Sequence, residues 1–347
     1  MIFNNFNHLN YVNFASSTMD SVIFNFIEVL CVLLPMLLCV AFVTIQERKQ
    51  LAAMQRRVGP DTVGYYGILQ PFSDALKLIL KETVIPSHSN KIIFVLAPVS
   101  TLVFSLLGWA IIPFGHGLAI SDFNMGILYT LALSSLGVYG ILFSGWSANS
   151  KYAFVGSLRS TAAMISYELI LSSAVLIIIL LTGSLNFTTI IELQQAIWFI
   201  IPLCSVFIFY FIAILAETSR TPFDLQEAES ELVSGFMTEH SAVPFVFFFL
   251  GEYSSIVLFS CITAILFLGG YHMPEIIVNE SIINLQSIFL GLKTCIFTFV
   301  FILVRATLPR LRYDQLIELC WLYLLPVALA FIVLVPSLLL SFDIAPY

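Results

Sequence analysis

The stretch that decides the fold is residues 244–269, which read PFVFFFLGEYSSIVLFSCITAILFLG and contain one charged side chain, Glu252. A helix of about 20 mainly apolar residues is long enough to cross a bilayer. The stretch is therefore predicted to be a transmembrane helix, and Glu252 is a charge inside it that needs an explanation.

Similar stretches recur along the chain, and glycine-containing breaks such as Gly115-His116-Gly117 separate them. Helices pair all their backbone groups internally, as a bilayer requires, whereas a barrel would show short alternating strands. The predicted fold class is an all-α, polytopic transmembrane bundle with about eight spans. The other seven are 22–46, 92–114, 125–145, 163–183, 197–216, 286–304 and 320–342.

Composition supports a membrane protein. Of 347 residues, 59% are hydrophobic and only 10% are charged, whereas soluble domains carry about 25% charged residues. The net charge is −7, and nucleic-acid binders are basic. A soluble globular protein, a disordered chain and a nucleic-acid partner are therefore excluded.

The basic residues lie on one side of the predicted bundle. Every Lys and Arg except Lys293 falls in the first, third, fifth or seventh connection, and basic connections mark the inner face. We expect both termini on the outer side, an N-terminal extension over 1–21 and a single transmembrane domain over 22–347. The structured inner loops are expected at 47–91, 146–162, 217–243 and 305–319.

The first inner loop contains a predicted amphipathic helix that begins at Pro71. Its apolar residues recur at helical spacing, and its charged residues lie off that face. This pattern is typical of a helix lying on the membrane surface, which serves either as an anchor or as the floor of a site. The apolar positions are Phe72, Ala75, Leu76, Ile79 and Leu80.

The third inner loop is acidic. Thr221-Pro222 followed by Asp224 predicts a helix start with a hydroxyl cap and proline in the first turn. Asp224, Glu227 and Glu231 then fall within about 60° of one another on one helical face. Crowded carboxylates raise one another's pKa values and share protons. The alternative is a solvated acidic helix.

Besides Glu28, near the outer end of the first span, three charged residues lie inside the predicted spans, where ionisable groups usually serve function. Glu168 and Glu252 lie toward the inner side, and Lys293 is placed near the midplane. One interpretation is a structural ion pair between Glu252 and Lys293. The favoured interpretation is a proton-handling chain that runs from the acidic loop through Glu217 to Glu168 and Glu252.

Several kinds of site are not indicated. The six cysteines form no C-x-x-C pair, and the five histidines lie outside the spans, so neither a metal nor a haem site is predicted. Nucleotide-binding motifs are missing from the sequence. The first basic residue is Arg48, so neither a secretory signal nor a transit peptide is expected. No complete active site is expected in this chain alone, and any electron carriers belong to partners.

Several motifs resemble one family closely, the quinone-chamber membrane subunits of respiratory complex I (NADH:ubiquinone oxidoreductase). The resemblance extends from about residue 22 to the end. The motifs are ERK at 47–49, RRVGP at 56–60, GILQPFSDALKLILKE at 67–82, SYE at 166–168, AETSRTPFDLQEAESELVSGF at 216–236, GEY at 251–253 and RATLPRLRYDQ at 305–315.

The resemblance implies roles for individual residues. It implies a proton pathway that couples quinone reduction to proton translocation, formed by Glu168, Glu217, Asp224, Glu227, Glu229, Glu231 and Glu252. It also implies a channel through which ubiquinone reaches its chamber, with Arg48, Asp74, Lys77, Phe249, Tyr253 and Arg305 along it.

The resemblance also implies the setting. Ubiquinone is the substrate, no cofactor is bound permanently, and FMN and iron–sulfur clusters belong to partner subunits. The expected partners are peripheral-arm quinone-site and iron–sulfur subunits, small membrane-arm and antiporter-like subunits, and lipid. The expected location is the mitochondrial inner membrane, with the bacterial plasma membrane as alternative.

Two rival functions and one structural role remain open at the level of sequence. The rivals are the membrane subunit of a proton-linked hydrogenase and a free-standing proton-coupled transporter, and the third possibility is a purely structural membrane anchor. The sequence also departs from the family pattern at Ser219, Met237 and His240, where relatives often have Asn, Asn and Tyr.

Overall fold

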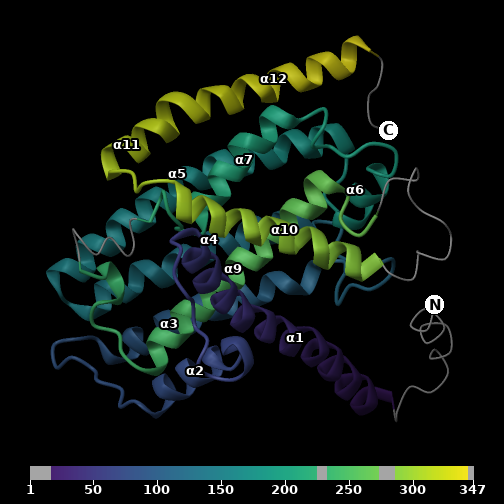
Figure 1. The fold of residues 1–347 in the computed structure, drawn as a ribbon. Helices are drawn as coiled ribbons and strands as arrows, with labels where there is room; N and C mark the ends of the chain where they lie inside the picture. Colours follow the sequence, from purple (N-terminus) through teal and green to yellow (C-terminus); the bar gives the residue numbers. More distant parts are fainter. Residues whose placement is uncertain (1–16, 225–232, 273–285, 343–347) are drawn as a thin grey trace.

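The computed structural model describes residues 17–224, 233–272 and 286–342, which contain helices and connecting turns and no strand (Figure 1). Most of the 1–21 extension, and Glu227, Glu229 and Glu231, lie outside these residues. The α-helices are α1 (Ser17–Met54), α2 (Gln70–Leu80), α3 (Lys91–Leu107), α4 (Gly126–Ala148), α5 (Lys151–Thr182), α6 (Phe187–Leu193), α7 (Cys204–Glu217), α9 (Val243–Leu268), α10 (Gln286–Thr307), α11 (Tyr313–Glu318) and α12 (Leu325–Ser341).

The all-α membrane fold is confirmed. Within the described residues, seven helical segments are long and apolar enough to cross a membrane, and α7, with 14 residues, is a shorter apolar helix. The seventh such segment joins α11, a π-helical turn at Leu319–Leu324 and α12. The predicted number of about eight apolar spans is therefore close to the structure.

The fifth predicted span, 197–216, is helical only in its second part. Residues 199–203 form turns, and α7 begins at Cys204. Pro202 lacks an N–H donor and disfavours helical geometry at the residue before it. The preceding backbone is tied to neighbouring elements instead, since Ile200 N donates to the Phe267 carbonyl at 3.1 Å.

The fourth predicted span begins earlier than expected. We predicted helix from residue 163, but α5 begins at Lys151. Ser150 caps it by accepting a hydrogen bond from Ala153 N at 3.3 Å, and Asn149, with φ of 53°, ends α4 in the left-handed region that Asn tolerates. Much of the expected loop 146–162 is therefore helical.

The core lies around α5, α7 and α9. In the most apolar window of α9, 61% of residues are buried, against 11% for the segment that contains α12. Tyr167 of α5 and Tyr210 of α7 are buried in this core. Figure 1 shows α12 along the top of the bundle, outside α5 and α7. The central position of α9 places Glu252 inside the protein.

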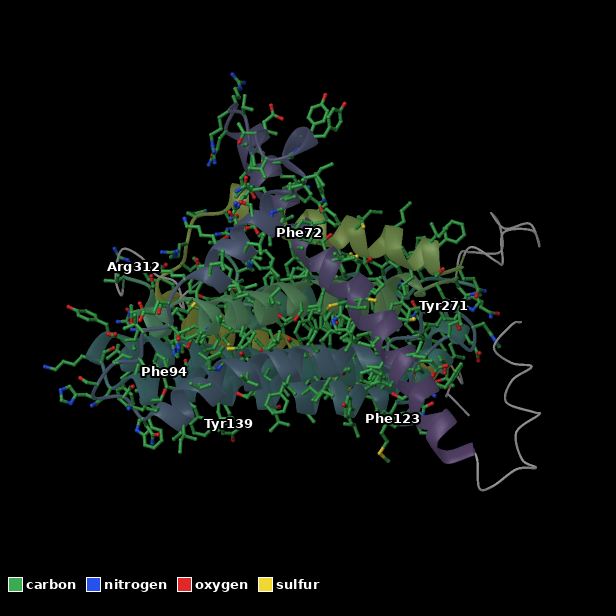
Figure 2. The ribbon with its side chains drawn as sticks, turned by 90° about the horizontal axis from the view of Figure 1, so that it is seen from below. Phe72, Phe94, Phe123, Tyr139, Tyr271 and Arg312 are labelled. Atoms are coloured by element: carbon green, nitrogen blue, oxygen red, sulfur yellow. The ribbon has the colours of Figure 1, made fainter. Side chains whose placement is uncertain are left out.

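The bundle has two distinct ends. Figure 2 shows Phe94 and Arg312 at one end and Phe123 and Tyr271 at the other. We call the first the arginine end, because Arg220, Arg305, Arg310 and Arg312 lie there, and the second the α6 end, because it holds α6 and the end of α9.

The predicted helix in the first inner loop is confirmed as α2, which packs against α1 through Phe72 and Phe42, whose ring centroids are 6.3 Å apart.

Candidate functional site

A buried carboxylate, Glu47, is the centre of the arginine end. It lies two turns before the end of α1 and is 4% exposed. It accepts hydrogen bonds from Tyr253 Oη at 2.6 Å, from Arg220 Nη1 at 3.2 Å and from Arg305. Helices α1, α9 and α10 and the segment after α7 are thus joined at one carboxylate.

Arg220 links this carboxylate to a second one. Ser219 ends α7 with φ of 51°, which turns the chain back so that Arg220 N donates to the Leu215 carbonyl at 3.1 Å. The Arg220 guanidinium lies 3.4 Å from Glu252 and 4.4 Å from the centre of the Tyr253 ring. Burial alone lowers the pKa of Arg220, but Glu252, Tyr253 and Glu47 outweigh it and raise that pKa. The guanidinium therefore stays charged between two carboxylates.

An aromatic surface lies beside the charged cluster. Phe249 and Tyr253 are one turn apart on α9 and stack with ring centroids 6.3 Å apart. Arg305, in the last turn of α10, keeps 30% of its side chain exposed beside the buried Glu47. A flat aromatic wall next to a partly exposed hydrogen-bond donor suits a flat ligand that carries carbonyl oxygens.

The segment after α7 is held by the connection after α10. Arg310 Nη2 donates to Asp224 at 2.8 Å, and Leu311 N donates to the Pro222 carbonyl at 3.0 Å. The helix start predicted at Thr221 is wrong, because residues 221–224 form a turn with a cis Thr221–Pro222 bond. The Asp224 carboxylate accepts a hydrogen bond from Arg310. Glu227, Glu229 and Glu231 lie outside the described residues.

The predicted channel residues on α2 lie at the edge of this arrangement. Asp74 accepts a hydrogen bond from Arg48 at 2.7 Å and from Gln70 at 2.9 Å. The Arg48 side chain is 53% exposed and that of Asp74 is 37% exposed. Lys77 is exposed on the same helix. These three residues therefore form an accessible surface outside the buried cluster.

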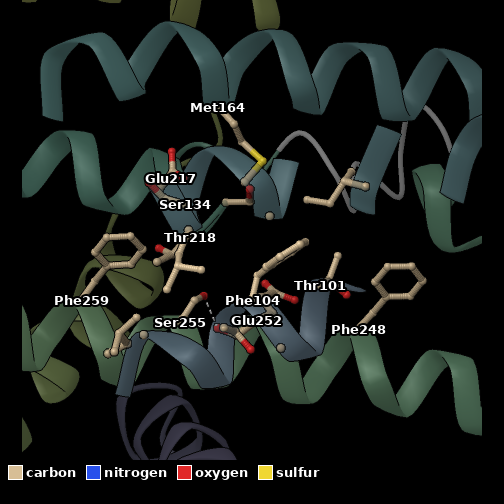
Figure 3. Close-up of a pocket in the computed structure, with 18 of the residues that line it drawn as sticks. Thr101, Phe104, Ser134, Met164, Glu217, Thr218, Phe248, Glu252, Ser255 and Phe259 are labelled. Atoms are coloured by element: carbon tan, nitrogen blue, oxygen red, sulfur yellow. Dashed lines mark hydrogen bonds between the residues drawn. The ribbon is translucent and has the colours of Figure 1, made fainter. Parts of the chain in front are cut away.

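A cavity of about 110 Å³ lies next to the cluster, between helices α3, α4, α5, α7 and α9. Figure 3 shows Glu217 and Thr218 on one side of it and Glu252 and Ser255 on the other. Glu217 is 5% exposed, and its Oε2 has no hydrogen-bond partner among the described residues. The volume is enough for several water molecules, which would satisfy such an oxygen.

Glu168 adds a third carboxylate close to Glu217. It accepts a hydrogen bond from Ser135 of α4, and its carboxylate is close enough to Glu217 to interact electrostatically. Of the predicted proton-pathway residues, the structure therefore places Glu217 and Glu252 on one cavity, with Glu168 next to Glu217 and outside the cavity lining. Successive carboxylates joined by water and hydroxyl groups are suited to passing protons.

His240 is packed beside the same cavity. Its ring stacks on Phe94 with centroids 4.0 Å apart and meets Phe248 edge-on at 5.1 Å. Burial lowers the pKa of His240 to about 4, and the backbone of Ser144 opposes this only weakly. His240 is thus neutral at physiological pH and packs as an aromatic ring.

Lys293 has a different role from the one proposed on sequence. It does not pair with Glu252. Its ammonium binds the carbonyls of Leu268, Gly270 and His272 at the α6 end. Glu252 pairs with Arg220 instead.

Two cluster residues were not selected from the sequence. Glu47 and Arg220 stood inside recognised motifs, the ERK and the acidic loop, but their burial was not visible in the sequence. The available signal for Glu47 was an acid at the very end of an apolar run.

Within the described ranges, no three His, Cys, Asp or Glu side chains are grouped as metal ligands.

Comparison with known proteins gives one consistent result. The NADH dehydrogenase family model matches residues 27–336. The chain is 65% identical to NADH-ubiquinone oxidoreductase chain 1 of Mycosarcoma maydis over 95% of this chain and 100% of the relative. It is 57% identical to the protein of that name from Podospora anserina, over 94% of this chain and 98% of the relative. It is also 50% identical to a bacterial relative, a subunit of the NADH-quinone oxidoreductase of Rhodospirillum centenum, over 92% of this chain and 95% of the relative.

Proposed function

Because the chain belongs to the NADH dehydrogenase family, we propose that it is a membrane subunit of a proton-translocating NADH:ubiquinone oxidoreductase. In this proposal it forms the channel and chamber for ubiquinone and couples quinone reduction to proton translocation. FMN and iron–sulfur clusters are carried by partner subunits. The fungal relatives favour the mitochondrial inner membrane, and the bacterial relative leaves the plasma membrane as alternative.

The observation that carries the proposal is the position of Arg220. One buried guanidinium binds Glu47, which faces the aromatic surface and Arg305, and also lies against Glu252, which lines the cavity. A charge-assisted contact of this kind is stronger than a neutral hydrogen bond. A change at the quinone side therefore alters the electrostatics of the cavity side through one shared cation.

The quinone step follows from the groups present. Quinone carbonyl oxygens accept hydrogen bonds, and reduction to quinol takes up two protons and two electrons. Arg305 and Tyr253 are the donors beside the aromatic wall of Phe249. Negative charge that develops on the quinone competes with Glu47 for these donors. Arg220 is then drawn toward Glu47 and away from Glu252.

The proton step takes place around the cavity. When Arg220 moves its charge away from Glu252, that carboxylate binds a proton more readily, and the reverse change releases it. Glu217 lies on the other side of the same cavity, and Glu168, which is close to Glu217, continues the relay. Asp224, Glu227, Glu229 and Glu231 belong to the pathway by resemblance, with Asp224 held by Arg310.

The proposed membership is tested by native purification of the complex that contains this chain. We expect flavin, iron–sulfur and antiporter-like subunits in the same complex, with NADH:ubiquinone reductase activity. A complex with hydrogenase subunits, or a chain that purifies alone, contradicts the proposal.

The proposed coupling is tested with Glu252→Gln in the assembled complex. We expect ubiquinone reduction and proton pumping to fall together, by about tenfold, because loss of the ionised partner disturbs a buried charge pair by at least about 1.4 kcal/mol. The control is Glu192→Gln, at the exposed far end of α6, which should leave both rates intact. Full activity of assembled Glu252→Gln, or an equal loss in the control, overturns this role.

A further inference from the structure

Lys293 is a buried cation at the opposite end of the bundle from the arginine cluster. It is 4% exposed, and its ammonium lies 2.7 Å from the Leu268 carbonyl, 2.7 Å from that of Gly270 and 2.6 Å from that of His272. An ammonium has three donors, and all three are used. The side chain is therefore held in one position.

Lys293 is held by carbonyl dipoles and an aromatic ring rather than by an opposite charge among the described residues. The three carbonyls lie at and just beyond the C-terminus of α9, where the helix dipole favours a cation, and the Trp198 ring is 5.1 Å away. Within 17–224, 233–272 and 286–342, no carboxylate oxygen lies within ion-pair distance of the ammonium. The charge of Lys293 also acts on His272. Burial is the main cause that lowers the pKa of His272; Glu192 raises that pKa, and Lys293 and His116 lower it further.

The backbone next to Lys293 is held by a buried amide. Gln194 is 1% exposed; its Oε1 accepts from Phe199 N at 3.4 Å and Gly269 N at 3.0 Å, and its Nε2 donates to the Ile265 carbonyl at 2.9 Å. This amide satisfies backbone groups where α6 and α9 end. These groups therefore need no water as a hydrogen-bond partner.

A layer of aromatic rings lies directly inside this polar cap. Phe207 of α7 contacts Phe267 with ring centroids 5.2 Å apart and Phe297 at 6.0 Å, and Tyr210 contacts Phe267 at 5.0 Å. Phe297 lies one turn from Lys293 on α10, and Phe267 precedes the Leu268 carbonyl. The cation thus stands at the outer border of an apolar layer.

The carboxylate cavity ends just inside this layer. It extends from Glu217 and Glu252 to Phe259 and Ile262. A second, apolar cavity of about 10 Å³ shares Phe259 and Ile262 with it and reaches Leu266, which is two residues, or about 3 Å of helix, from Leu268. A space of that size is at or below the limit for one water molecule.

We propose that Lys293 is an electrostatic seal, a fixed buried positive charge that prevents protons in the carboxylate cavity from crossing the α6 end. An apolar layer alone opens to water transiently, and a proton that enters must then approach an ammonium beside which the described residues place no counter-ion. The seal rests on the proposed proton handling by Glu217 and Glu252. A mere helix cap needs the hydrogen bonds of Lys293 but not its charge, and this difference can be tested.

The test uses the assembled complex reconstituted into sealed vesicles without NADH, with an imposed diffusion potential and a pH-sensitive dye inside. Lys293→Gln removes the charge but keeps N–H donors, and Lys293→Arg keeps the charge. We expect proton conductance to rise about tenfold in Lys293→Gln, equal to about 1.4 kcal/mol of barrier. In Lys293→Arg it should match the wild type, and NADH:ubiquinone reductase activity should be normal in both.

Three results overturn the seal: unchanged conductance in Lys293→Gln, an equal rise in Lys293→Arg, or a parallel leak of entrapped sodium ions, which indicates defective packing. The double variant Lys293→Gln with Glu217→Gln separates the seal from the proposed function. Suppression of the leak in the double variant supports both the seal and the carboxylate path. A leak that persists undiminished supports the seal and contradicts the carboxylate path.

Discussion

Arg305 reaches the Glu47 carboxylate from the last turn of α10 and is the cluster arginine beside the aromatic wall that keeps an exposed side-chain surface, at 30%. For Arg305→Ala we expect the KM for ubiquinone to rise roughly tenfold to a hundredfold, because a hydrogen bond from a charged donor contributes about 1.5–3 kcal/mol. Assembly should be intact, since Arg220 and Tyr253 still hold Glu47.

The measurement is steady-state kinetics of purified complex with a short-chain ubiquinone. Arg305→Lys is the matched control: it keeps the charge but loses the planar fork of donors, so its KM should lie between those of the wild type and Arg305→Ala. An unchanged KM in assembled Arg305→Ala contradicts a role in quinone binding.

His240 provides a pH-dependent prediction. Its pKa is lowered to about 4 in the folded protein from an ordinary value of 6.5, by burial against Phe94 and Phe248. The unfolded chain therefore binds a proton that the folded chain does not, and stability is lost as the pH falls from 6.5 toward 4. The loss attributable to this side chain is about 2 kcal/mol at pH 5.

We expect His240→Tyr to remove this component, because the phenol stays neutral across the range. Thermal denaturation of the purified complex between pH 7.5 and 5 measures it. The wild type should lose more thermal stability on acidification than the variant, and identical pH dependence in the two proteins counts against a buried neutral histidine.

Among the helices, the contact of α5 with the segment after residue 232 controls the cavity wall. A Cβ added at Gly156 of α5 would lie 2.8 Å from the Gly235 Cα and 3.0 Å from its carbonyl carbon. Phe236 and Met237, which follow Gly235, line the carboxylate cavity. For Gly156→Ala we expect the complex to be destabilised by about 1–3 kcal/mol, since backbone atoms have to move.

Gly291→Ala is the control for this contact. Gly291 lies within α10, and a Cβ there meets nothing within 4 Å, so alanine should be neutral or stabilise the helix by up to about 1 kcal/mol. Melting temperatures of the two assembled variants provide the comparison. Equal melting temperatures for Gly156→Ala and Gly291→Ala would show that the segment after residue 232 shifts at no cost in stability. The contact between Gly156 and Gly235 would then not hold the cavity wall.

The helices could be predicted because apolar length is a local property of the chain. Positions 244–269 need no knowledge of their neighbours to be recognised as a span, and α9 occupies Val243–Leu268. The early start of α5 and the turns before α7 were not predicted. They depend on the Ser150 cap and on Gln194, whose partners come from α6 and α9.

The site was predicted in part for the same reason. Glu168 and Glu252 were found because a carboxylate in an apolar run is rare. The cluster around Glu47 was not predicted. Its residues meet only after α1, α9 and α10 pack together; they are Glu47, Arg220, Tyr253 and Arg305. Lys293 was misassigned because sequence position gives no information about backbone carbonyls, which are its partners.

Over the whole molecule, the two ends have opposite chemistry. The arginine end joins several helices through ionised side chains, with α2 exposed beside it, whereas in the described part of the α6 end backbone carbonyls bind one amide and one ammonium. Figure 1 shows these ends separated by the length of the bundle. Proton exchange is therefore expected through the first end and along the cavity, and not through the second.

The arginine end also obeys a constraint of electroneutrality. Glu47, Glu252 and Asp224 are matched by Arg220, Arg305 and Arg310, so these six groups sum to zero. One uncompensated charge about 4 Å from another contributes about 4 kcal/mol at an effective dielectric constant of 20. Under the proposed function, an electron that reaches a quinone beside this cluster cannot rest there alone; it must be accompanied by a proton or by the displacement of a guanidinium. In that proposal, charge balance makes electron transfer and proton transfer parts of one event.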